Sequence, residues 1–202
     1  MSDPIANRPL DGAARSVPAG GSAPADPDLA AVLAAQRNPA DFAALYHRYL
    51  DAVYSYAFYQ LGDHHDAEDA TARTFLAALR AIGLFRDEGA SFRAWLFRIA
   101  RNTIRNAHRT RARRRTEPME AMPLEPPAPD ADPAGLALRA EEARRIRAAV
   151  AALPDDRRQV VLLRFADGLS AREIGQVLDR SEGAVRVLLH RALKDLAGQL
   201  NP

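Results

Sequence analysis

Apolar residues recur every three to five positions through two long stretches of the chain, which is the spacing of helices that bury one face. Nothing alternates with a period of two for long enough to form a strand. The pattern therefore predicts an all-α protein. In the first stretch, the positions expected to be buried are Phe42, Leu45, Tyr49, Val53, Tyr56, Leu61, Ala67, Ala70, Phe75, Leu79, Ile82, Phe92, Trp95, Leu96, Ile99 and Ile104.

Helix start and stop signals divide this first stretch. Asp26 followed by Pro27 predicts a helix that begins at the proline, with the aspartate as its N-cap. A second helix is expected to run from Asn38 to Gly62. Asp63 and Ser91 are expected to cap two further helices, over residues 64–83 and 92–114.

The second stretch predicts a helix that breaks at Pro154, another that stops at Gly168, and then a tight helical pair. Ser170–Glu173 has the S-x-x-E spacing of a capping box. The sequence "DRS" forms the turn, and its Ser181 is the next N-cap. Ile174, Val177 and Leu178 are expected to face inward, Gly175 to allow a close helix crossing, and Val185, Leu188 or Leu189, Ala192, Leu193 and Leu196 to form the stripe of the last helix.

Composition separates these stretches into two domains. Residues 1–26 are rich in Pro, Gly, Ala and Ser with little periodicity, which predicts a disordered N-terminal extension. The segment "TEPMEAMPLEPPAPDADPAG" has six prolines and five acids, so residues 115–135 are expected to be a flexible linker. Two small helical domains remain, over residues 27–114 and 136–200.

Charge is unevenly distributed although the net charge is only +2. Residues 91–115 carry nine arginines and no acid, which favours a surface that binds a polyanion. The chain has no Cys, no signal-peptide pattern and no apolar run near the ~20 residues needed to cross a bilayer. We therefore expect a soluble, cytoplasmic protein that does not insert into a membrane.

The tight helical pair is typical of a helix-turn-helix, whose second helix reads base edges in the major groove. Arg186 can pair with guanine, Glu182 can accept from cytosine, and Ala184 can touch a thymine methyl. A helical hairpin with a solvated charged face would show the same periodicity. The capping box and the Ser-capped basic helix favour DNA binding.

The quoted residues resemble a known family. "LPDDRRQVVLLRFADGLSAREIGQVLDRSEGAVRVLLHRALKDL" is similar to region 4 of a sigma-70-family factor, although LuxR-type regulators share this helix pair. "DAEDATARTFLAAL" resembles region 2.2, and "SFRAWLFRIARNTIRNAHRTRARR" resembles regions 2.3 and 2.4. Both matches in this order, with no region 3 between them, resemble an extracytoplasmic-function (group IV) sigma factor.

This resemblance implies a sigma region 2 helical bundle and a sigma region 4 helix-turn-helix, which bind RNA polymerase core (its beta and beta-prime subunits) and promoter DNA. It also implies an anti-sigma factor as partner. The residues expected to contact polymerase are Asp66, Glu68, Asp69, Arg73 and Phe75. Those expected at the −10 element are Arg86, Arg93, Trp95, Arg98, Arg101, Asn102, Arg105, Asn106 and Arg109. Those expected at the −35 element are Ser170, Arg172, Ser181, Glu182, Gly183, Ala184, Arg186, His190 and Arg191.

The chemistry of residues 91–115 agrees with this assignment, because melted DNA needs basic groups for phosphates and aromatic or planar groups for unstacked bases. Trp95, Phe97 and Asn102 lie among the arginines, although Trp95 also belongs to the buried stripe. By resemblance, the preceding loop, residues 84–90, captures a flipped base, which costs a few kcal/mol to extract.

Two departures from the family pattern qualify the assignment. Ala72 and Arg73 replace the Gln-Glu pair that usually follows "DAED" in region 2.2. In the recognition helix "AVRVL" replaces a frequent "Thr-Val-Lys-Ser-Arg", so Val187 and Leu188 lack polar groups there. The resemblance therefore does not carry over a −35 sequence preference.

Enzymatic function is not expected, because the sequence has no catalytic cluster and no phosphate-binding loop. No cofactor or metal is expected either, since the adjacent His64 and His65 point about 100° apart on a helix. Two rival functions differ in what they require of the chain. A helix-turn-helix regulator would bind duplex DNA without polymerase, and a nuclease would need the missing catalytic cluster.

Overall fold

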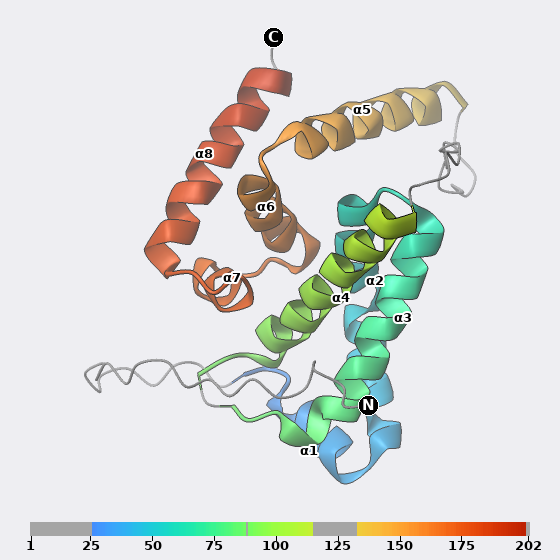
Figure 1. The fold of residues 1–202 in the computed structure, drawn as a ribbon, viewed down its shortest axis with the longest axis vertical. Helices are drawn as coiled ribbons and strands as arrows, with labels where there is room; N and C mark the ends of the chain where they lie inside the picture. The colour runs from blue at the N-terminus through green and yellow to red at the C-terminus, as the bar shows by residue number, and fades with distance from the viewer. Residues whose placement is uncertain (1–25, 88, 115–132, 201–202) are drawn as a thin grey trace.

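The computed structural model describes residues 26–87, 89–114 and 133–200, and these residues form helices and no strand (Figure 1). The prediction of an all-α fold is confirmed. The predicted N-terminal extension and most of the linker lie outside the described residues. The elements are α1 (Leu29–Arg37), η1 (Pro39–Asp41), α2 (Phe42–Leu61), α3 (His64–Ala81), η2 (Ile82–Leu84), α4 (Phe92–Arg114), α5 (Pro133–Ala152), α6 (Asp155–Asp167), α7 (Ala171–Leu178) and α8 (Glu182–Leu200).

Helix starts in the first domain follow the capping residues with one exception. The Asp63 carboxylate accepts from the amide of Asp66 at 2.8 Å, and the Ser91 hydroxyl accepts from the amide of Ala94 at 3.2 Å. The prediction that the first helix begins at Pro27 is wrong, because α1 begins at Leu29, although the Asp26 carboxylate still accepts from the amide of Asp28 at 3.0 Å. The other oxygen of the Asp26 carboxylate accepts from the amide of Phe92, which ties the chain before α1 to the start of α4.

Helices α1 to α4 pack into a bundle around the apolar stripes of α2 and α4. Most of the predicted buried positions are buried, while Leu79, Trp95 and Ile99 are half-buried at the edge of the core. Phe97 is fully buried and packs edge-on against Tyr56. The suggestion that Phe97 is an aromatic group available to DNA is therefore wrong.

Helices α5 to α8 form the second domain. The capping box of α7 is confirmed: the Ser170 hydroxyl accepts from the Glu173 amide at 3.2 Å, and the Glu173 carboxylate accepts from the Ser170 amide at 2.9 Å. Ser181 caps α8 through the amide of Ala184. The prediction for Leu193 is wrong, because its side chain is 49% exposed on the rim of an apolar groove.

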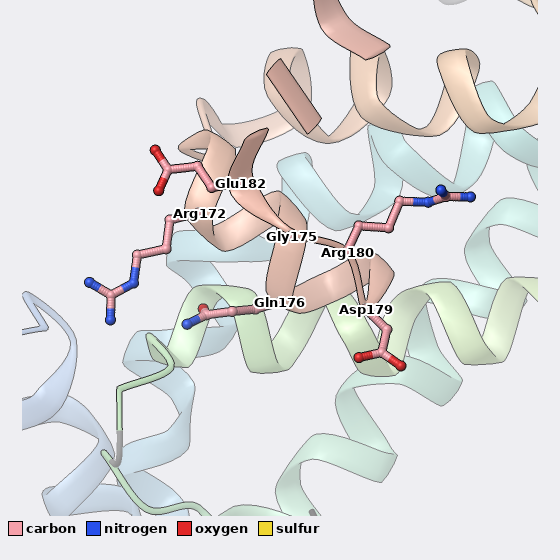
Figure 2. Close-up of a pocket in the computed structure, with 6 residues that line it drawn as sticks. All are labelled: Arg172, Gly175, Gln176, Asp179, Arg180 and Glu182. Carbon is pink, nitrogen blue, oxygen red and sulfur yellow. The ribbon is translucent and has the colours of Figure 1, made fainter. Parts of the chain in front are cut away.

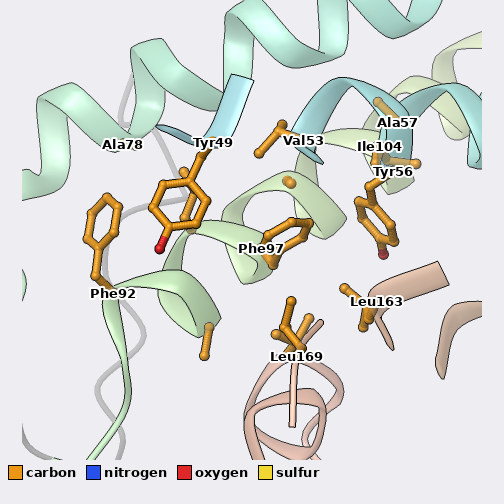
Figure 3. Close-up of a cluster of buried hydrophobic side chains, with 14 of the residues drawn as sticks. Tyr49, Val53, Tyr56, Ala57, Ala78, Phe92, Phe97, Ile104, Leu163 and Leu169 are labelled. Atoms are coloured by element: carbon orange, nitrogen blue, oxygen red, sulfur yellow. The ribbon is translucent and has the colours of Figure 1, made fainter. Parts of the chain in front are cut away.

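The larger of two hydrophobic clusters spans both domains (Figure 3). Leu163 of α6 and Leu169, just before α7, are fully buried and belong to the same cluster as Tyr56 and Phe97. Accordingly, α6 packs against α2, and α7 packs along α4. Each fully buried leucine contributes about 1.5–3 kcal/mol relative to exposure, so this junction is a substantial apolar contact.

Candidate nucleic-acid interface

The helix-turn-helix is formed by α7 and α8, and a close backbone approach shapes its turn. A Cβ on Gly175 would lie 2.6 Å from the carbonyl oxygen of Arg180. Asp179 completes the turn in the left-handed region, with φ of 59°. The element that crosses Gly175 is therefore the turn itself and the start of α8, whereas another helix was expected there. This approach sets the angle at which α8 leaves α7.

The outer face of this unit presents polar side chains of both helices. Arg186 on α8 forms an ion pair with Glu182 one turn earlier, so the two expected base contacts are held side by side. A shallow pocket opens at the turn (Figure 2), lined by Arg172, Gly175, Gln176, Asp179, Arg180 and Glu182. The expected −35 residues that are exposed are Ser170, Arg172, Ser181, Glu182, Gly183, Arg186, His190 and Arg191, while Ala184 is half-buried.

Helix α4 carries the second basic surface. Arg98, Asn102, Arg105 and Arg109 are exposed on it, and Asn106 accepts a hydrogen bond from Arg109. Arg86 lies in the loop before α4, where its guanidinium donates to the carbonyls of Gly83 and Phe85, each at 2.8 Å. These side chains can reach phosphates without disturbing the core.

Trp95 is held differently from these exposed groups. Its ring is half-buried and packs against Phe85 and Phe92, with ring centroids 5.5 Å apart in each pair. Gln36 of α1 supports the same region, because its amide donates to the carbonyls of Ile82 and Phe85 at 2.9 and 3.0 Å. Trp95 therefore builds the wall of the loop before α4, and only part of it is open to a base.

Arg93, at the start of α4, is engaged across the domain boundary. Its Nη2 lies 2.7 Å from Oε2 of Glu173, and its Nε lies 3.2 Å from Oε1 of the same carboxylate. Its Nη1 donates to the backbone carbonyl of Asp167 at 2.9 Å. Ser91 donates to Oε1 of Glu173 at 2.7 Å. The forked pair of Arg93 and Glu173 is the geometry that gives strong, oriented ion pairs.

The electrostatics of this cluster follow from its partial burial. Burial alone would raise the pKa of Glu173, but hydrogen bonds from Arg93, Ser170 and Ser91 lower it to about 2. Burial raises the pKa of the Asp167 carboxyl, because the charge of Arg93 only partly offsets it. Glu173 is therefore the anion that the cluster stabilises.

Further contacts join the same surfaces. Arg101 of α4 donates to Oε1 of Gln159 on α6 at 3.0 Å. Burial lowers the pKa of this guanidinium. Gln176 of α7 donates to the backbone carbonyl of Gly89, in the loop before α4, at 2.6 Å. Thus two of the arginines expected at the −10 element, and the loop beside them, face the second domain.

An acidic surface lies on α3. Glu68 and Asp69 are exposed, and Asp69 pairs with Arg73 at 2.8 Å. Asp66 is half-buried in the first turn. Phe75, expected to contact polymerase, is buried between Phe42 and Tyr46. Phe75 is therefore a core residue. Its buried ring supports α3 and is not available for the direct contact with polymerase that was expected.

One buried polar cluster had no signal in the sequence pattern. Asp28 is buried and accepts hydrogen bonds from Arg48 and from the hydroxyl of Tyr49. Burial and this carboxylate raise the pKa of Tyr49. Asp28 precedes a helix and would be taken for a solvated residue, because nothing local in the sequence announces its distant partners.

Among the described residues there is no group of three or more His, Cys, Asp or Glu side chains placed to hold a metal ion. His64 instead packs against Phe58, with ring centroids 4.4 Å apart, and bonds to the Tyr54 hydroxyl. No helix in the described part of the chain is long and apolar enough to span a bilayer.

Comparison with known proteins finds two family models, each of which matches the part of the chain that carries one of the two surfaces. A family model described as Sigma-70 region 2 matches residues 45–114, and one described as Sigma-70, region 4 matches residues 143–196. The first model covers α2 to α4, and the second covers the end of α5 together with α6, α7 and most of α8. Each basic surface therefore lies inside one matched region.

Curated relatives match across both regions. The chain is 38% identical over 164 residues to the ECF RNA polymerase sigma factor BldN of Streptomyces coelicolor, covering 81% of this chain but only 62% of that relative's length. It is 30% identical to the ECF RNA polymerase sigma factor SigW of Bacillus subtilis, covering 79% of this chain and 88% of SigW. A solved structure of CnrH in complex with the cytosolic domain of CnrY matches with a TM-score of 0.65 and 28% identity, covering 86% of this chain and 97% of that chain.

Proposed function

The chain belongs to the sigma-70 family, in its extracytoplasmic-function group, and from this premise we propose that it directs RNA polymerase core to promoters. In this proposal α8 reads the −35 element, and α4 with its preceding loop opens and reads the −10 element. The family is one of transcription initiation factors, not of enzymes in the ordinary sense. We extend this to propose that the chain has no catalytic activity of its own and works in the cytoplasm, where polymerase and DNA are.

The observation that carries the proposal is the pairing of two basic surfaces of different kinds on one chain. The α8 surface offers short-range donors and acceptors at a helix N-terminus, which suits duplex base edges. The α4 surface offers arginines and amides beside a half-buried tryptophan, which suits phosphates and unstacked bases. A helix-turn-helix regulator would need only the first surface.

Core polymerase is the partner that we assign to the acidic surface of α3. Glu68 and Asp69 project from a helix whose opposite face is packed in the bundle, so the charges sit on a rigid support. Such a surface favours a basic partner by charge complementarity. The Asp69–Arg73 pair adds a cation where the family pattern has an acid, so the contact differs locally from that pattern.

Run-off transcription tests the proposal. Purified core polymerase is combined with a genomic template library, with and without the full-length chain. The expected result is a set of discrete transcripts that depends on the added chain. Absence of such transcripts on every template, with core polymerase that responds to another sigma factor, would refute the assignment. If the chain instead binds duplex DNA sequence-specifically without polymerase, the alternative function as a helix-turn-helix regulator would be favoured.

We also propose an anti-sigma protein as partner, because a sigma factor of similar fold, RpoE, is solved in complex with the anti-sigma factor NepR from Bartonella quintana. An apolar groove between α2 and the second domain supports this. Its exposed apolar rim consists of Tyr59, Ile146, Phe165 and Leu193. An apolar helix laid in the groove would cover these side chains. Replacing Phe165, which is 69% exposed, with Asp should abolish co-purification of such a protein, while the matched change at Leu76, exposed on α3, should not.

A further inference from the structure

The loop that leads into α4 is fastened to a part of the chain outside the matched region 2. The family model for region 2 begins at residue 45, whereas α1 and the short segment before it, residues 26–28, precede that point. Helix α1 packs against η2, the turn that follows α3 (Figure 1). This early part of the chain therefore lies against the start of the loop proposed to receive the −10 base, which we call the −10 loop.

Gln36 on α1 holds the entry to the −10 loop. Its side-chain amide donates to the carbonyl of Ile82 at 2.9 Å and to that of Phe85 at 3.0 Å. The NH₂ group of a glutamine has two donors, so one side chain can serve both carbonyls. Leu84 lies between these carbonyls in the sequence and is 69% exposed. The bonds therefore fix the backbone here and leave the side chain between them open to solvent.

Asp26 holds the exit from the loop. One oxygen of its carboxylate accepts from the amide of Phe92, the first residue of α4, and the other accepts from the amide of Asp28. The first amides of a helix have no partner within the helix, and a negative charge at that end is favoured by the helix dipole. Ser91 serves the amide of Ala94 in the same turn. Asp26 therefore adds a second cap to α4 from a distant part of the chain.

The segment that carries Asp26 is itself anchored in the first domain. The Asp28 side chain is buried and accepts from Arg48 and from the hydroxyl of Tyr49, both on α2. The Tyr49 ring packs against that of Phe92, with ring centroids 5.9 Å apart (Figure 3). A buried carboxylate is costly without its donors, so this segment cannot shift freely relative to α2 and α4.

The entry to the loop also forms the wall beside Trp95. Phe85, whose carbonyl bonds to Gln36, is buried, and its ring centroid lies 5.5 Å from that of Trp95 and 5.8 Å from that of Phe92. A displacement of the backbone at Phe85 therefore moves a ring that packs on Trp95. Because Trp95 is the one tryptophan of the chain, its fluorescence reports on this part of the loop.

We propose that α1 and residues 26–28 brace the −10 loop, with Gln36 and Asp26 as positioning residues that hold its two ends in the base-receiving form. What the loop receives rests on the proposed function, whereas the brace itself does not. A loop that is held in advance loses less backbone freedom when it takes up a base, and therefore binds the base more tightly. Helix α1 then contributes to promoter opening through the loop and not through a DNA contact of its own.

Acrylamide quenching of Trp95 fluorescence tests the brace in the free, full-length chain. Gln36→Met keeps the approximate length of the side chain and removes both donors, whereas Gln36→Lys keeps a donor. Asp26→Ala removes the cap of Phe92. Arg37→Met, at an exposed position on α1, is the matched control.

We expect quenching about twofold stronger in Gln36→Met and in Asp26→Ala, because the loop opens locally more often. Gln36→Lys and Arg37→Met should resemble the parent. Unchanged quenching in Gln36→Met and Asp26→Ala, with helix content intact by circular dichroism, would overturn the brace. An equal increase in Gln36→Lys would refute the role of the Gln36 donors. The two sites lie at opposite ends of the loop, so misfolding of one variant leaves the other to decide.

Binding of single-stranded −10 DNA by the polymerase complex tests positioning. A promoter found by run-off transcription with the parent chain supplies the strand. An abasic site is moved along it, and the position with the largest loss of affinity marks the captured base. We expect Gln36→Met to weaken binding of the intact strand about fivefold, because a smaller fraction of loops is in the binding-competent form.

The same variant should bind the strand with the abasic site at that position as the parent does, and should keep the parent's affinity for core polymerase. A merely structural defect would instead weaken both strands equally, and that result would refute the positioning role. If the parent chain gives no promoter-dependent transcripts, the proposed function fails, while the quenching result still decides the brace.

Discussion

The carbonyl oxygen of Arg180 lies 2.6 Å from the point that a Cβ on Gly175 would occupy, closer than real Cβ atoms approach. The amide of Arg180 donates back to the carbonyl of Gly175 at 2.9 Å. The turn between α7 and α8 is therefore folded onto the glycine itself. The neighbour is backbone, so it cannot rotate away as a side chain would.

Gly175→Ala should lower the free energy of unfolding by about 1–3 kcal/mol, because the turn must shift to admit the methyl group. Thermal unfolding followed by circular dichroism measures this. Gly183→Ala is the control: nothing lies within 4 Å of a Cβ there, so a small stabilisation of about 0.5–1 kcal/mol is expected in the helix. Equal stability of the two variants would contradict the close approach.

Tyr49→Phe should destabilise the first domain, because it leaves the buried Asp28 carboxylate short of one donor. The expected loss is about 1–3 kcal/mol. Denaturant unfolding at neutral pH measures it. Tyr59→Phe removes the same hydroxyl from a position that is exposed on the same helix, and should be neutral. A neutral Tyr49→Phe would show that Arg48 alone satisfies Asp28.

Acidification should weaken the contact between the domains. The pKa of Glu173 is lowered to about 2 in the folded chain from an ordinary 4.5, so its contribution is complete above pH 4.5 and is lost as pH falls through 2. Asp167 acts in the opposite sense, because burial raises its pKa and protonation relieves its buried charge. Arg93, which faces both carboxylates, stays charged throughout.

The measurement is the pH dependence of the free energy of unfolding of the parent chain and of Glu173→Gln. The parent should lose stability relative to the variant between pH 4.5 and 2, because only the parent has the titrating carboxylate. Parallel curves for the two chains would show that Glu173 is not stabilised as an anion.

Arg186→Ala should reduce promoter-dependent transcription about tenfold, which corresponds to one lost bidentate base contact of roughly 1–3 kcal/mol. The readout is run-off transcription on a promoter found with the parent chain. Lys194→Ala removes a cation further along α8 and should have little effect. Equal losses in the two variants would indicate general charge attraction to DNA instead of base reading.

Glu68→Lys combined with Asp69→Lys should weaken binding to core polymerase by about tenfold, because two charges of the acidic surface are reversed. Asp51→Lys, at an exposed position on α2, is the matched control. Competition against a labelled parent chain for core polymerase gives the affinities. An unchanged affinity in the double variant would remove the acidic surface of α3 from the interface.

Periodicity and capping chemistry predicted the helices well, because both are local. The caps at Asp63, Ser91, Ser170 and Ser181 form as their side chains allow. Local reasoning placed the start of the first helix too early and missed the second bond of Asp26, which its carboxylate accepts from the amide of Phe92 far along the chain. A distant partner of that kind leaves no mark on neighbouring positions.

The candidate site was predicted residue by residue but not as an arrangement. The arginine run of α4 signals polyanion binding, and nothing in it separates the exposed Arg98 from Arg93, which is committed to Glu173. Leu193 and Phe97 show the same limit. Leu193 lies at a stripe position like those of its buried neighbours but is exposed, whereas Phe97 lies among the arginines but is buried. Tertiary packing alone decides these two outcomes.

The shared core of the two domains has a consequence for the lifetime of the protein. While Leu163 and Leu169 are buried with Phe97, one apolar cluster spans both domains and keeps these side chains out of reach of a protease. Separation of the two domains would expose those side chains to water and make the chain a substrate for degradation or chaperone capture. The lifetime of the protein would then follow how rarely its domains separate.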